Sequence, residues 1–142
     1  FIMGARSKDG LMFRQRIGKI AELRVCTDDG SEGAKARTPE LVAGALAREK
    51  YGCVYTCGPE IMMKKVFDEC ERKKIPCQAS LERYFKCAIG VCGQCCLDDK
   101  LVCADGTVFG SEFLRKSEEF GKYTYERTGR RMTIEEWLKH GM

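Results

Sequence analysis

The sequence has 142 residues, of which 44% are hydrophobic and 32% charged, and its 25 basic and 21 acidic side chains give a net charge of +4. This length allows one domain with a hydrophobic core, or a small domain with an appendage. No stretch approaches the roughly 18 apolar residues of a membrane span, no signal-peptide pattern opens the chain, and no basic stripe interleaved with aromatic residues suggests nucleic-acid binding. We therefore expect a soluble cytoplasmic protein that binds neither membrane nor nucleic acid.

Short β-rich runs recur in the first part of the chain, and each ends in turn residues. They are FIMGAR at 1–6, LRVCT at 23–27, GCVYTCG at 52–58 and IPCQASLE at 75–82. The segments between them have helical spacing, so the order is strand, helix, strand, helix, strand, helix, strand. This alternation predicts an α/β fold with a parallel sheet covered on both faces by helices.

Two of the intervening helices have clear boundary signals. The first should follow Thr38, which can cap the free amides, with Pro39 at the first helical position and Gly52 just past the end. The second covers 59–74, where apolar residues recur at i, i+3, i+4 and i+7. These residues are Met63, Val66, Phe67 and Cys70.

Three turns should occupy the carboxyl ends of the strands, where α/β sheets bind ligands. They are GARS at 4–7, TDDGSEG at 27–33 and TCGPE at 56–60, and all are rich in residues that leave the backbone accessible. No glycine-rich G-x-G-x-x-G phosphate loop accompanies them. The sequence therefore reads as though the first strand of a dinucleotide-binding domain were missing.

Five of the ten cysteines cluster in the second half of the chain. Cys87, Cys92, Cys95 and Cys103 have the C-x4-C-x2-C…C spacing of plant-type two-iron clusters, and in a reducing compartment clustered cysteines bind metal more often than they form disulfides. Zinc is the weaker alternative, because only Cys92 and Cys95 form a C-x2-C pair. Cys96 should point away from Cys95 in an extended segment, but the spacing leaves open which of the two is the third ligand.

The C-terminal segment TIEEWLKHGM predicts a short helix. Thr133 and Glu136 have capping-box spacing, and Trp137 lies on the apolar face. We expect the helix to dock on the protein body, with its apolar face as a candidate subunit contact. His140 is expected to be an ordinary residue near the helix C-terminus rather than a metal ligand.

Several blocks of the chain, in this order, resemble the electron-transfer subunits of NAD-dependent dihydroorotate dehydrogenases, which belong to the ferredoxin reductase superfamily. The blocks are GARSKD, TDDGSEG, YTCGPEIMMK, IPCQASLERYFKCAIGVCGQCC, VCADGTVF and FGKY. The resemblance covers nearly the whole chain. It implies that residues 1–82 are the C-terminal part of an NAD-binding α/β domain, and that residues 83–142 are a plant-type 2Fe-2S cluster domain with a C-terminal tail.

The resemblance also implies a function and a set of cofactors. Family members pass electrons from NADH through FAD and a 2Fe-2S cluster to a separate FMN-containing catalytic subunit, which oxidises dihydroorotate to orotate in pyrimidine biosynthesis. The family's FAD-binding barrel and glycine-rich loop have no counterpart in this sequence. We therefore expect this chain alone to be inactive as a reductase.

Site residues are carried over from the resemblance position by position, and no catalytic residue is among them. The residues expected to bind nucleotide cofactor are Gly4, Ala5, Arg6, Asp28, Asp29, Gly30, Ser31, Cys57, Gly58, Pro59 and Glu60. The residues expected to ligate the cluster are Cys87, Cys92, Cys95 and Cys103. Two alternatives stay open: a reductase subunit of a hydrogenase or sulfur-reducing complex, and a zinc-stabilised binding module without enzymatic activity.

Overall fold

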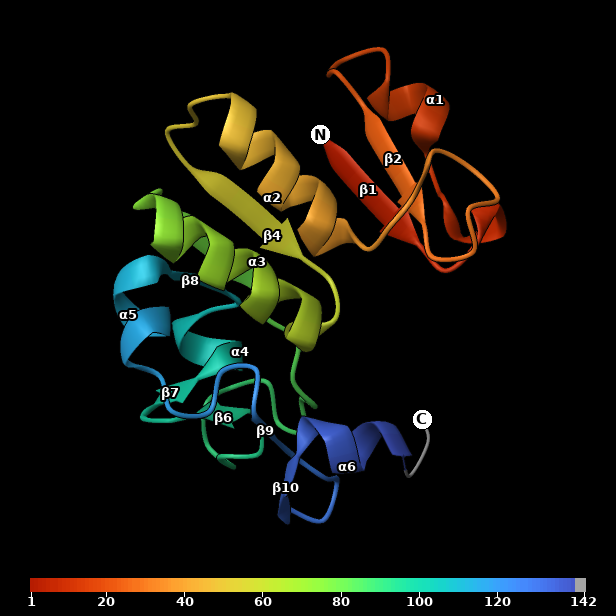
Figure 1. Cartoon of the computed structure of the whole chain (residues 1–142). Coiled ribbons are helices and arrows are strands. Elements are labelled where there is room, and N and C mark those ends of the chain that lie inside the picture. The colour runs from red at the N-terminus through yellow and green to blue at the C-terminus, as the bar shows by residue number, and fades with distance from the viewer. Residues whose placement is uncertain (140–142) are drawn as a thin grey trace. The chain divides into compact units, whose positions relative to one another are not determined.

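Three short parallel strands form the sheet of the first unit, Phe1–Lys50, in a computed structural model that describes residues 1–139 of the chain. The strands are β1 (Ile2–Ala5), β2 (Arg24–Thr27) and β3 (Ala34–Lys35), and they pair in this order. Helix α2 (Thr38–Arg48) packs against β1 and buries one apolar face (Figure 1). The predicted strands at 1–6 and 23–27 and the helix that follows Thr38 are therefore confirmed.

The helix expected between the first two strands is much shorter than the spacing suggested. The connection holds only a 3-10 turn, η1 (Lys8–Gly10), and a single helical turn, α1 (Arg14–Ile17). Its apolar residues do not make one buried stripe: Leu11 is buried, whereas Met12 and Phe13 are exposed. Phe13 also has a left-handed backbone, with φ of 58°, which a continuous α-helix does not allow.

The start of α2 corrects the expectation that Thr38 caps the helix. The N-cap is Arg37, whose backbone N–H donates to Glu40 Oε2 at 3.2 Å. Thr38 is already helical, and its Oγ1 lies 3.9 Å from Cys26 Sγ on the neighbouring strand. A Cβ at Gly4 would lie 2.0 Å from Thr38 Oγ1, so the close approach of β1 to α2 requires glycine there.

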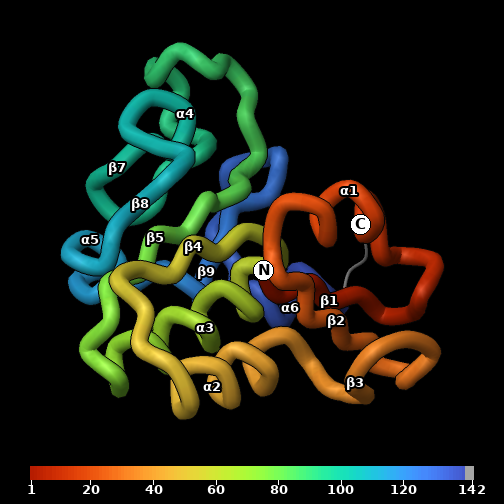
Figure 2. Tube along the Cα trace, turned by 90° about the horizontal axis from the view of Figure 1, so that it is seen from above, coloured from red at the N-terminus to blue at the C-terminus, as the bar shows by residue number. Residues whose placement is uncertain are grey.

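The second unit begins at Tyr51 and is built around helix α3 (Glu60–Lys73). Strands β4 (Val54–Cys57) and β5 (Cys77–Ser80) are parallel, and α3 connects them and packs on both (Figure 2). The four residues of α3 expected at the core are all buried, at 0 to 3% exposure. Cys77, Ala79 and Leu81 are buried on β5 and just after it, which confirms the alternation predicted for that strand.

The rest of the second unit consists of short elements after β5. Strand β8 (Val108–Gly110) adds to the free edge of β5 in the antiparallel direction. The remaining elements are β6 (Cys96–Leu97), β7 (Lys100–Leu101), α4 (Val102–Asp105), α5 (Ser111–Lys116), β9 (Tyr123–Tyr125), β10 (Arg131–Thr133) and α6 (Ile134–Lys139). The predicted domain boundary at residues 82 and 83 thus falls inside this second unit, and it stays a prediction about family organisation.

The α/β class with parallel strand pairs is confirmed. Within residues 1–139 each unit has one three-stranded sheet, β1-β2-β3 in the first and β4-β5-β8 in the second, and the second unit also has the two-stranded pairs β6-β7 and β9-β10. A single parallel sheet that includes strands of both units stays a prediction. None of the helices in this range is long and apolar enough to cross a bilayer.

The predicted C-terminal helix is present as α6, and it begins with the expected capping box. Thr133 Oγ1 accepts the backbone N–H of Glu136 at 3.1 Å, and the Thr133 N–H donates to Glu136 Oε2 at 2.9 Å. His140 lies outside the described residues.

Candidate functional site

The cysteine-rich segment that follows β5 has no helix or strand of its own between residues 85 and 95, a stretch called the cluster loop below. Its shape comes from left-handed backbone positions: φ is 58° at Ala88, 76° at Gly90 and 70° at Gly93. Repeated turns of this kind direct successive backbone N–H groups into the loop, where they can face an anion.

Cys87 is the sulfur on which these amides converge. Three backbone N–H groups lower the pKa of the Cys87 thiol to about 6. They belong, from the largest effect to the smallest, to Ile89, Cys92 and Val91, and the Cys92 thiol lowers the pKa further. Hydrogen bonds to the charged form favour ionisation. Cys87 is therefore placed as a thiolate, which is the form that binds iron.

Cys95 and Cys103 form a second sulfur pair across a small hairpin. Cys95 comes directly before β6 and Cys103 lies in α4, and the Cys103 N–H donates to Cys95 Sγ at 3.4 Å. The Cys95 thiol raises the pKa of Cys103, whereas the backbone N–H of Gly90 acts in the opposite direction. Cys103 is thereby linked both to its partner and to the turn of the cluster loop.

The four predicted ligands thus interact as two pairs, Cys87 with Cys92 and Cys95 with Cys103, and the charges of Cys87 and Cys103 also influence one another. Across residues 1–139, no three His, Cys, Asp or Glu side chains form a group that could hold a single metal ion. Two pairs of cysteine side chains, with backbone N–H groups directed at the Cys87 and Cys95 sulfurs, are a donor set that suits an iron–sulfur cluster. The residues present therefore fit a two-iron cluster.

Cys96 has a different partner from its neighbour Cys95. Its thiol interacts with the Tyr125 hydroxyl of β9. Burial raises the pKa of that hydroxyl most, and its hydrogen bonds with Cys96 and Glu119 raise it further. Cys95 by contrast accepts the hydrogen bond from Cys103. This placement agrees with the expectation that the two adjacent side chains point in opposite directions.

Two of the three predicted nucleotide turns lie in the first unit and are joined by hydrogen bonds. The turn of Gly4, Ala5 and Arg6 accepts backbone N–H donors from the second turn: Asp28 donates to the Ala5 carbonyl at 3.1 Å and Asp29 to that of Arg6 at 3.2 Å. The structure therefore brings these two predicted turns together, and the Arg6 side chain is exposed beside them.

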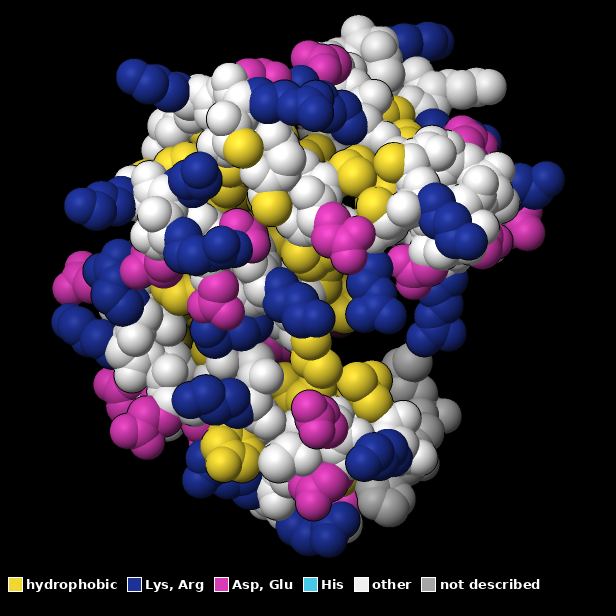
Figure 3. Space-filling model, viewed as in Figure 1, with side chains coloured by type: hydrophobic (Ala, Val, Ile, Leu, Met, Phe, Trp, Pro, Cys, Tyr) yellow, Lys and Arg dark blue, Asp and Glu magenta, His cyan; other side chains and the backbone are white. Residues whose placement is uncertain are grey.

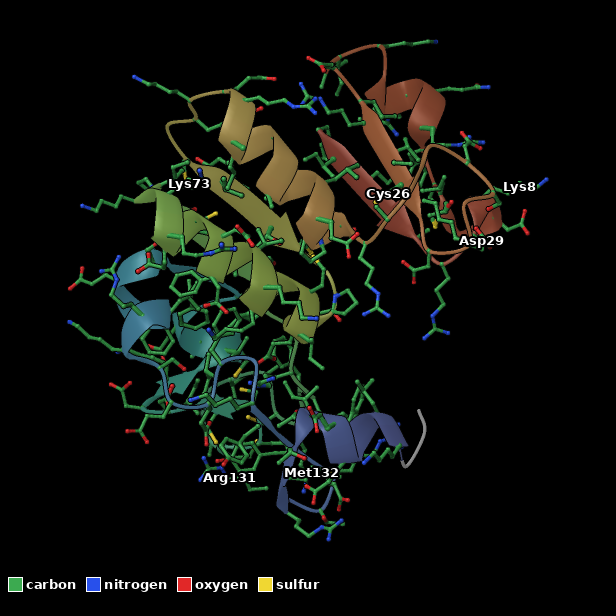
Figure 4. The ribbon with its side chains drawn as sticks, viewed as in Figure 1. Lys8, Cys26, Asp29, Lys73, Arg131 and Met132 are labelled. Carbon is green, nitrogen blue, oxygen red and sulfur yellow. The ribbon has the colours of Figure 1, made fainter. Side chains whose placement is uncertain are left out.

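The second turn is rigidified by its own side chains. Asp29 Oδ1 accepts the N–H of Ser31 at 2.9 Å and its hydroxyl at 2.6 Å, and these bonds lower the pKa of Asp29. Ser31 Oγ in turn accepts the backbone N–H of Lys8 at 2.8 Å (Lys8 and Asp29 are labelled in Figure 4). Gly30 sits in this turn with φ of 76°.

The third predicted turn lies in the second unit, at the end of β4. Cys57 is exposed there, and Gly58 has φ of 142°. Glu60 is engaged by the protein: its carboxylate pairs with both terminal nitrogens of Arg83, one of them at 3.0 Å, and accepts the N–H of Gly121 at 2.8 Å. The carboxylate predicted to face a nucleotide thus holds an ion pair whose two side chains are 3% and 9% exposed.

A pocket of about 340 Å³ lies beside this turn, between the N-terminus of α3 and helix α6. Its lining includes Pro59, Ile61, Tyr84, Trp137 and Leu138. Hydrophobic side chains reach the surface in this part of the molecule (Figure 3). The apolar face of α6, considered from the sequence as a subunit contact, therefore lines a pocket of its own unit.

Sequence reasoning missed the polar network that surrounds the second sulfur pair. Glu119 is buried at 6% exposure; it accepts hydrogen bonds from Asp98 and Tyr125 and forms an ion pair with Arg131. Neither Glu119 nor its partners Tyr125 and Arg131 belong to a spacing pattern, because they meet only in the folded chain. In the sequence Glu119 follows Glu118 in the polar run SEEF, so no local signal marks it as buried.

Comparison with protein families matches residues 82–115 to the iron–sulfur cluster binding domain of dihydroorotate dehydrogenase B. The match includes all four predicted ligand positions. It confirms the expected resemblance for the part of the chain that contains the cluster loop and the hairpin after it.

Relatives extend the similarity over nearly the whole chain. A probable dihydroorotate dehydrogenase B (NAD(+)) electron transfer subunit from Methanocaldococcus jannaschii is 49% identical over 133 residues, which are 92% of this chain and 52% of that protein. Its counterpart from Methanothermobacter thermautotrophicus is 42% identical over 134 residues, which are 92% of this chain and 50% of that protein. The chain thus spans about half the length of the curated relatives it matches.

A solved structure of an NADH-dependent reduced ferredoxin-NADP oxidoreductase, described in connection with flavin-based electron bifurcation, has a similar fold. It superimposes with a TM-score of 0.67 at 29% identity and covers 78% of this chain and 42% of that one. Similarity to an oxidoreductase therefore holds for three-dimensional structure as well as for sequence.

Proposed function

We propose that this chain is the cluster-bearing part of an electron-transfer subunit of an NAD-dependent dihydroorotate dehydrogenase. In this proposal Cys87, Cys92, Cys95 and Cys103 ligate a plant-type 2Fe-2S cluster. The observation that carries it is the convergence of three backbone N–H groups on the Cys87 sulfur, together with the hydrogen bond from the Cys103 N–H to Cys95 Sγ. The family match over residues 82–115 supports the same assignment.

The protein's part in such a centre is to hold the sulfurs and to stabilise their charge. When bound, a 2Fe-2S cluster takes up and releases one electron at a time, at a potential set partly by hydrogen bonds to the sulfurs. The amides of Ile89, Val91 and Cys92 supply such bonds at Cys87, and the Cys103 N–H supplies one at Cys95. Cys96 interacts with Tyr125 and is left out of the ligand set.

The electron donor in this proposal is NADH, with FAD as the intermediate carrier. The hydrogen-bonded turns at Gly4–Arg6 and Asp28–Ser31 support a nucleotide role, because they combine exposed backbone with the free guanidinium end of Arg6. Cys57, Gly58 and Pro59, which lie in the second unit, are assigned to nucleotide binding by resemblance. Glu60 belongs to this set by resemblance, and its direct role is to pair with Arg83.

The electron acceptor in this proposal is the FMN-containing catalytic subunit. The surface of the cluster loop supports a protein partner, since Ile89 and Val91 are 75% and 78% exposed between the ligand positions. Exposed apolar side chains beside a functional site are typical of protein contact surfaces. A docked partner would cover them and shorten the path from cluster to flavin.

The decisive test is chemical analysis of the purified chain. We expect about two irons and two acid-labile sulfides per chain, a visible absorption that dithionite bleaches, and an electron paramagnetic resonance (EPR) signal in the reduced state. A colourless protein with one zinc per chain would contradict the proposal and support the zinc-stabilised module.

The structural similarity to an NADH-dependent reduced ferredoxin-NADP oxidoreductase favours a second candidate for the protein that accepts electrons from the cluster. In that case the cluster chemistry is unchanged, but the partner is another redox enzyme. Co-purification distinguishes the two. Bleaching by dihydroorotate only when the catalytic subunit is present supports the first assignment, and failure of that subunit to bind supports the second.

A further inference from the structure

The two proposed ligands Cys95 and Cys103 are joined by a very short hairpin. Strands β6 and β7 contribute two residues each, and the chain reverses at Asp98, whose φ is 51°. Two paired residues on each side cannot hold a hairpin in one conformation by themselves. Other parts of the unit must therefore fix the separation of these two sulfurs.

Glu119 reaches this hairpin from outside, together with Ser117 and Glu118, whose hydroxyl and backbone N–H donate to the Asp98 carboxylate. Its Oε2 accepts the backbone N–H of Asp98 at 3.0 Å, directly at the turn. Its Oε1 accepts the Tyr125 hydroxyl at 3.0 Å and forms an ion pair with Arg131, whose Nε lies 3.1 Å away. Arg131, labelled in Figure 4, also lies over the Tyr123 ring, with its guanidinium carbon 4.0 Å from the ring centroid.

A second contact runs from Glu119 to the start of the hairpin. The Tyr125 hydroxyl that donates to Glu119 also interacts with the thiol of Cys96, the residue next to Cys95. One buried carboxylate thus holds the hairpin at its turn and, through Tyr125, at its first residue. Both contacts lie on the covalent path between Cys95 and Cys103.

We propose that Glu119 is a positioning residue for the Cys95–Cys103 end of the cluster, and that its buried negative charge also makes the cluster harder to reduce. This inference rests on the proposed function, because it presupposes a cluster at these cysteines. It adds to that function a residue outside the ligand set that sets both the retention of the cluster and its reduction potential.

The carboxylate is needed because two of its partners are hydrogen-bond donors and the third is a cation. The Asp98 N–H donates to Oε2, the Tyr125 hydroxyl donates to Oε1, and the Arg131 guanidinium forms an ion pair with Oε1. A glutamine has one acceptor oxygen and one NH₂ group, so in either orientation its NH₂ would face a donor. An unpaired buried donor is destabilising, and here it would lie either at the Asp98 turn or at Tyr125.

The test compares E119Q with E118Q in the full chain after iron and sulfide loading. Glu118 is adjacent in sequence and exposed, so E118Q removes the same charge without the buried contacts. We expect E119Q to release iron to a chelator about tenfold faster than wild type, as substitution of groups that orient metal ligands commonly does. We also expect its reduction potential, from an EPR-monitored titration, to shift upward, and E118Q to match wild type in both measurements.

Equal potentials and release rates for E119Q and E118Q would overturn the inference. If E119Q does not fold, the Y125F variant tests the inference instead. It removes only the hydroxyl between Glu119 and Cys96. We expect it to release iron faster than wild type and to change the visible circular dichroism spectrum. A Y125F protein identical to wild type in both would then overturn it. Absence of iron and sulfide from the wild-type protein would instead contradict the proposed function itself.

Discussion

Helix α3 and the cluster loop lie in the same unit, yet they are held in place by opposite means. The core residues of α3 are 0 to 3% exposed, whereas Ile89 and Val91 in the loop are 75% and 78% exposed. Burial of apolar surface fixes the helix. The loop is fixed by left-handed backbone positions and by N–H groups that face sulfur. We therefore expect the helix to be indifferent to the cluster, and the loop to depend on it.

The largest expected effect is that of C92S on the cluster. Loss of one of four thiolates should remove the iron and sulfide almost completely, because serine is a poor ligand for a soft thiolate site. Hydrogen exchange should then show lost amide protection in residues 85–95 and unchanged protection in α3. Iron analysis and exchange mass spectrometry measure the two effects.

C96S is the matched control for that experiment. Since Cys96 interacts with Tyr125 rather than with the other sulfurs, C96S should keep the wild-type iron and sulfide content. A cluster retained in C92S but lost in C96S would mean that the ligand set is wrong.

Truncation of a phenylalanine should reduce the free energy of unfolding much more in α3 than in the cluster loop. F67A removes a side chain that is 3% exposed and stacks edge-on against Phe120 at 5.9 Å between ring centroids, and it should lower the free energy of unfolding by about 3–5 kcal/mol. F85A, in the cluster loop at 41% exposure, should change it by no more than about 0.5 kcal/mol. Urea denaturation measures both, and equal losses would contradict the contrast.

The buried ion pair at the start of α3 allows a buried and an exposed carboxylate to be compared in the same way. E60Q leaves the Arg83 guanidinium, which is 3% exposed, without its counter-charge, and should destabilise the protein by about 3 kcal/mol. E82Q removes an exposed carboxylate nearby and should have little effect. A stable E60Q protein would show that the pair is dispensable.

The smallest expected effects come from two glycine substitutions. G90A places a Cβ in a left-handed position, 3.2 Å from the Cβ of Ala104, and should cost about 1 kcal/mol, seen as roughly fivefold faster iron release. G44A acts in the middle of α2, where a Cβ meets nothing within 4 Å, and should stabilise by about 0.5–1 kcal/mol. Opposite signs of the two effects would show that glycine is needed at position 90 but not at position 44.

Sequence periodicity was sufficient where burial decides the structure. Met63, Val66, Phe67 and Cys70 were predicted to be buried from a 3.6-residue repeat, and all four are. The same reasoning overestimated the connection after β1, because the apolar residues around Phe13 do not share one face. Hydrophobicity without periodicity does not define a helix.

Polar tertiary contacts were beyond the reach of the sequence. The Glu60–Arg83 pair joins positions 23 residues apart, and Glu119 meets donors from three segments. Such contacts leave no local pattern, because each partner is an ordinary charged residue until the chain folds. The four cysteines could be singled out from the sequence, since three of them lie in one loop with spacing typical of a two-iron site, and their role as ligands stays a prediction.

The carboxylate of Glu60 holds two distant parts of the second unit together. Its Oε1 accepts hydrogen bonds from both Arg83 Nη2, at 3.0 Å, and the Gly121 N–H, at 2.8 Å. The residues on either side of segment 84–120 are therefore bound to the same carboxylate oxygen. A short linker in place of segment 84–120 would keep its two ends together, but it would remove Phe120 from its contact with Phe67 of α3. It would also give β5 a bare edge where β8 now pairs.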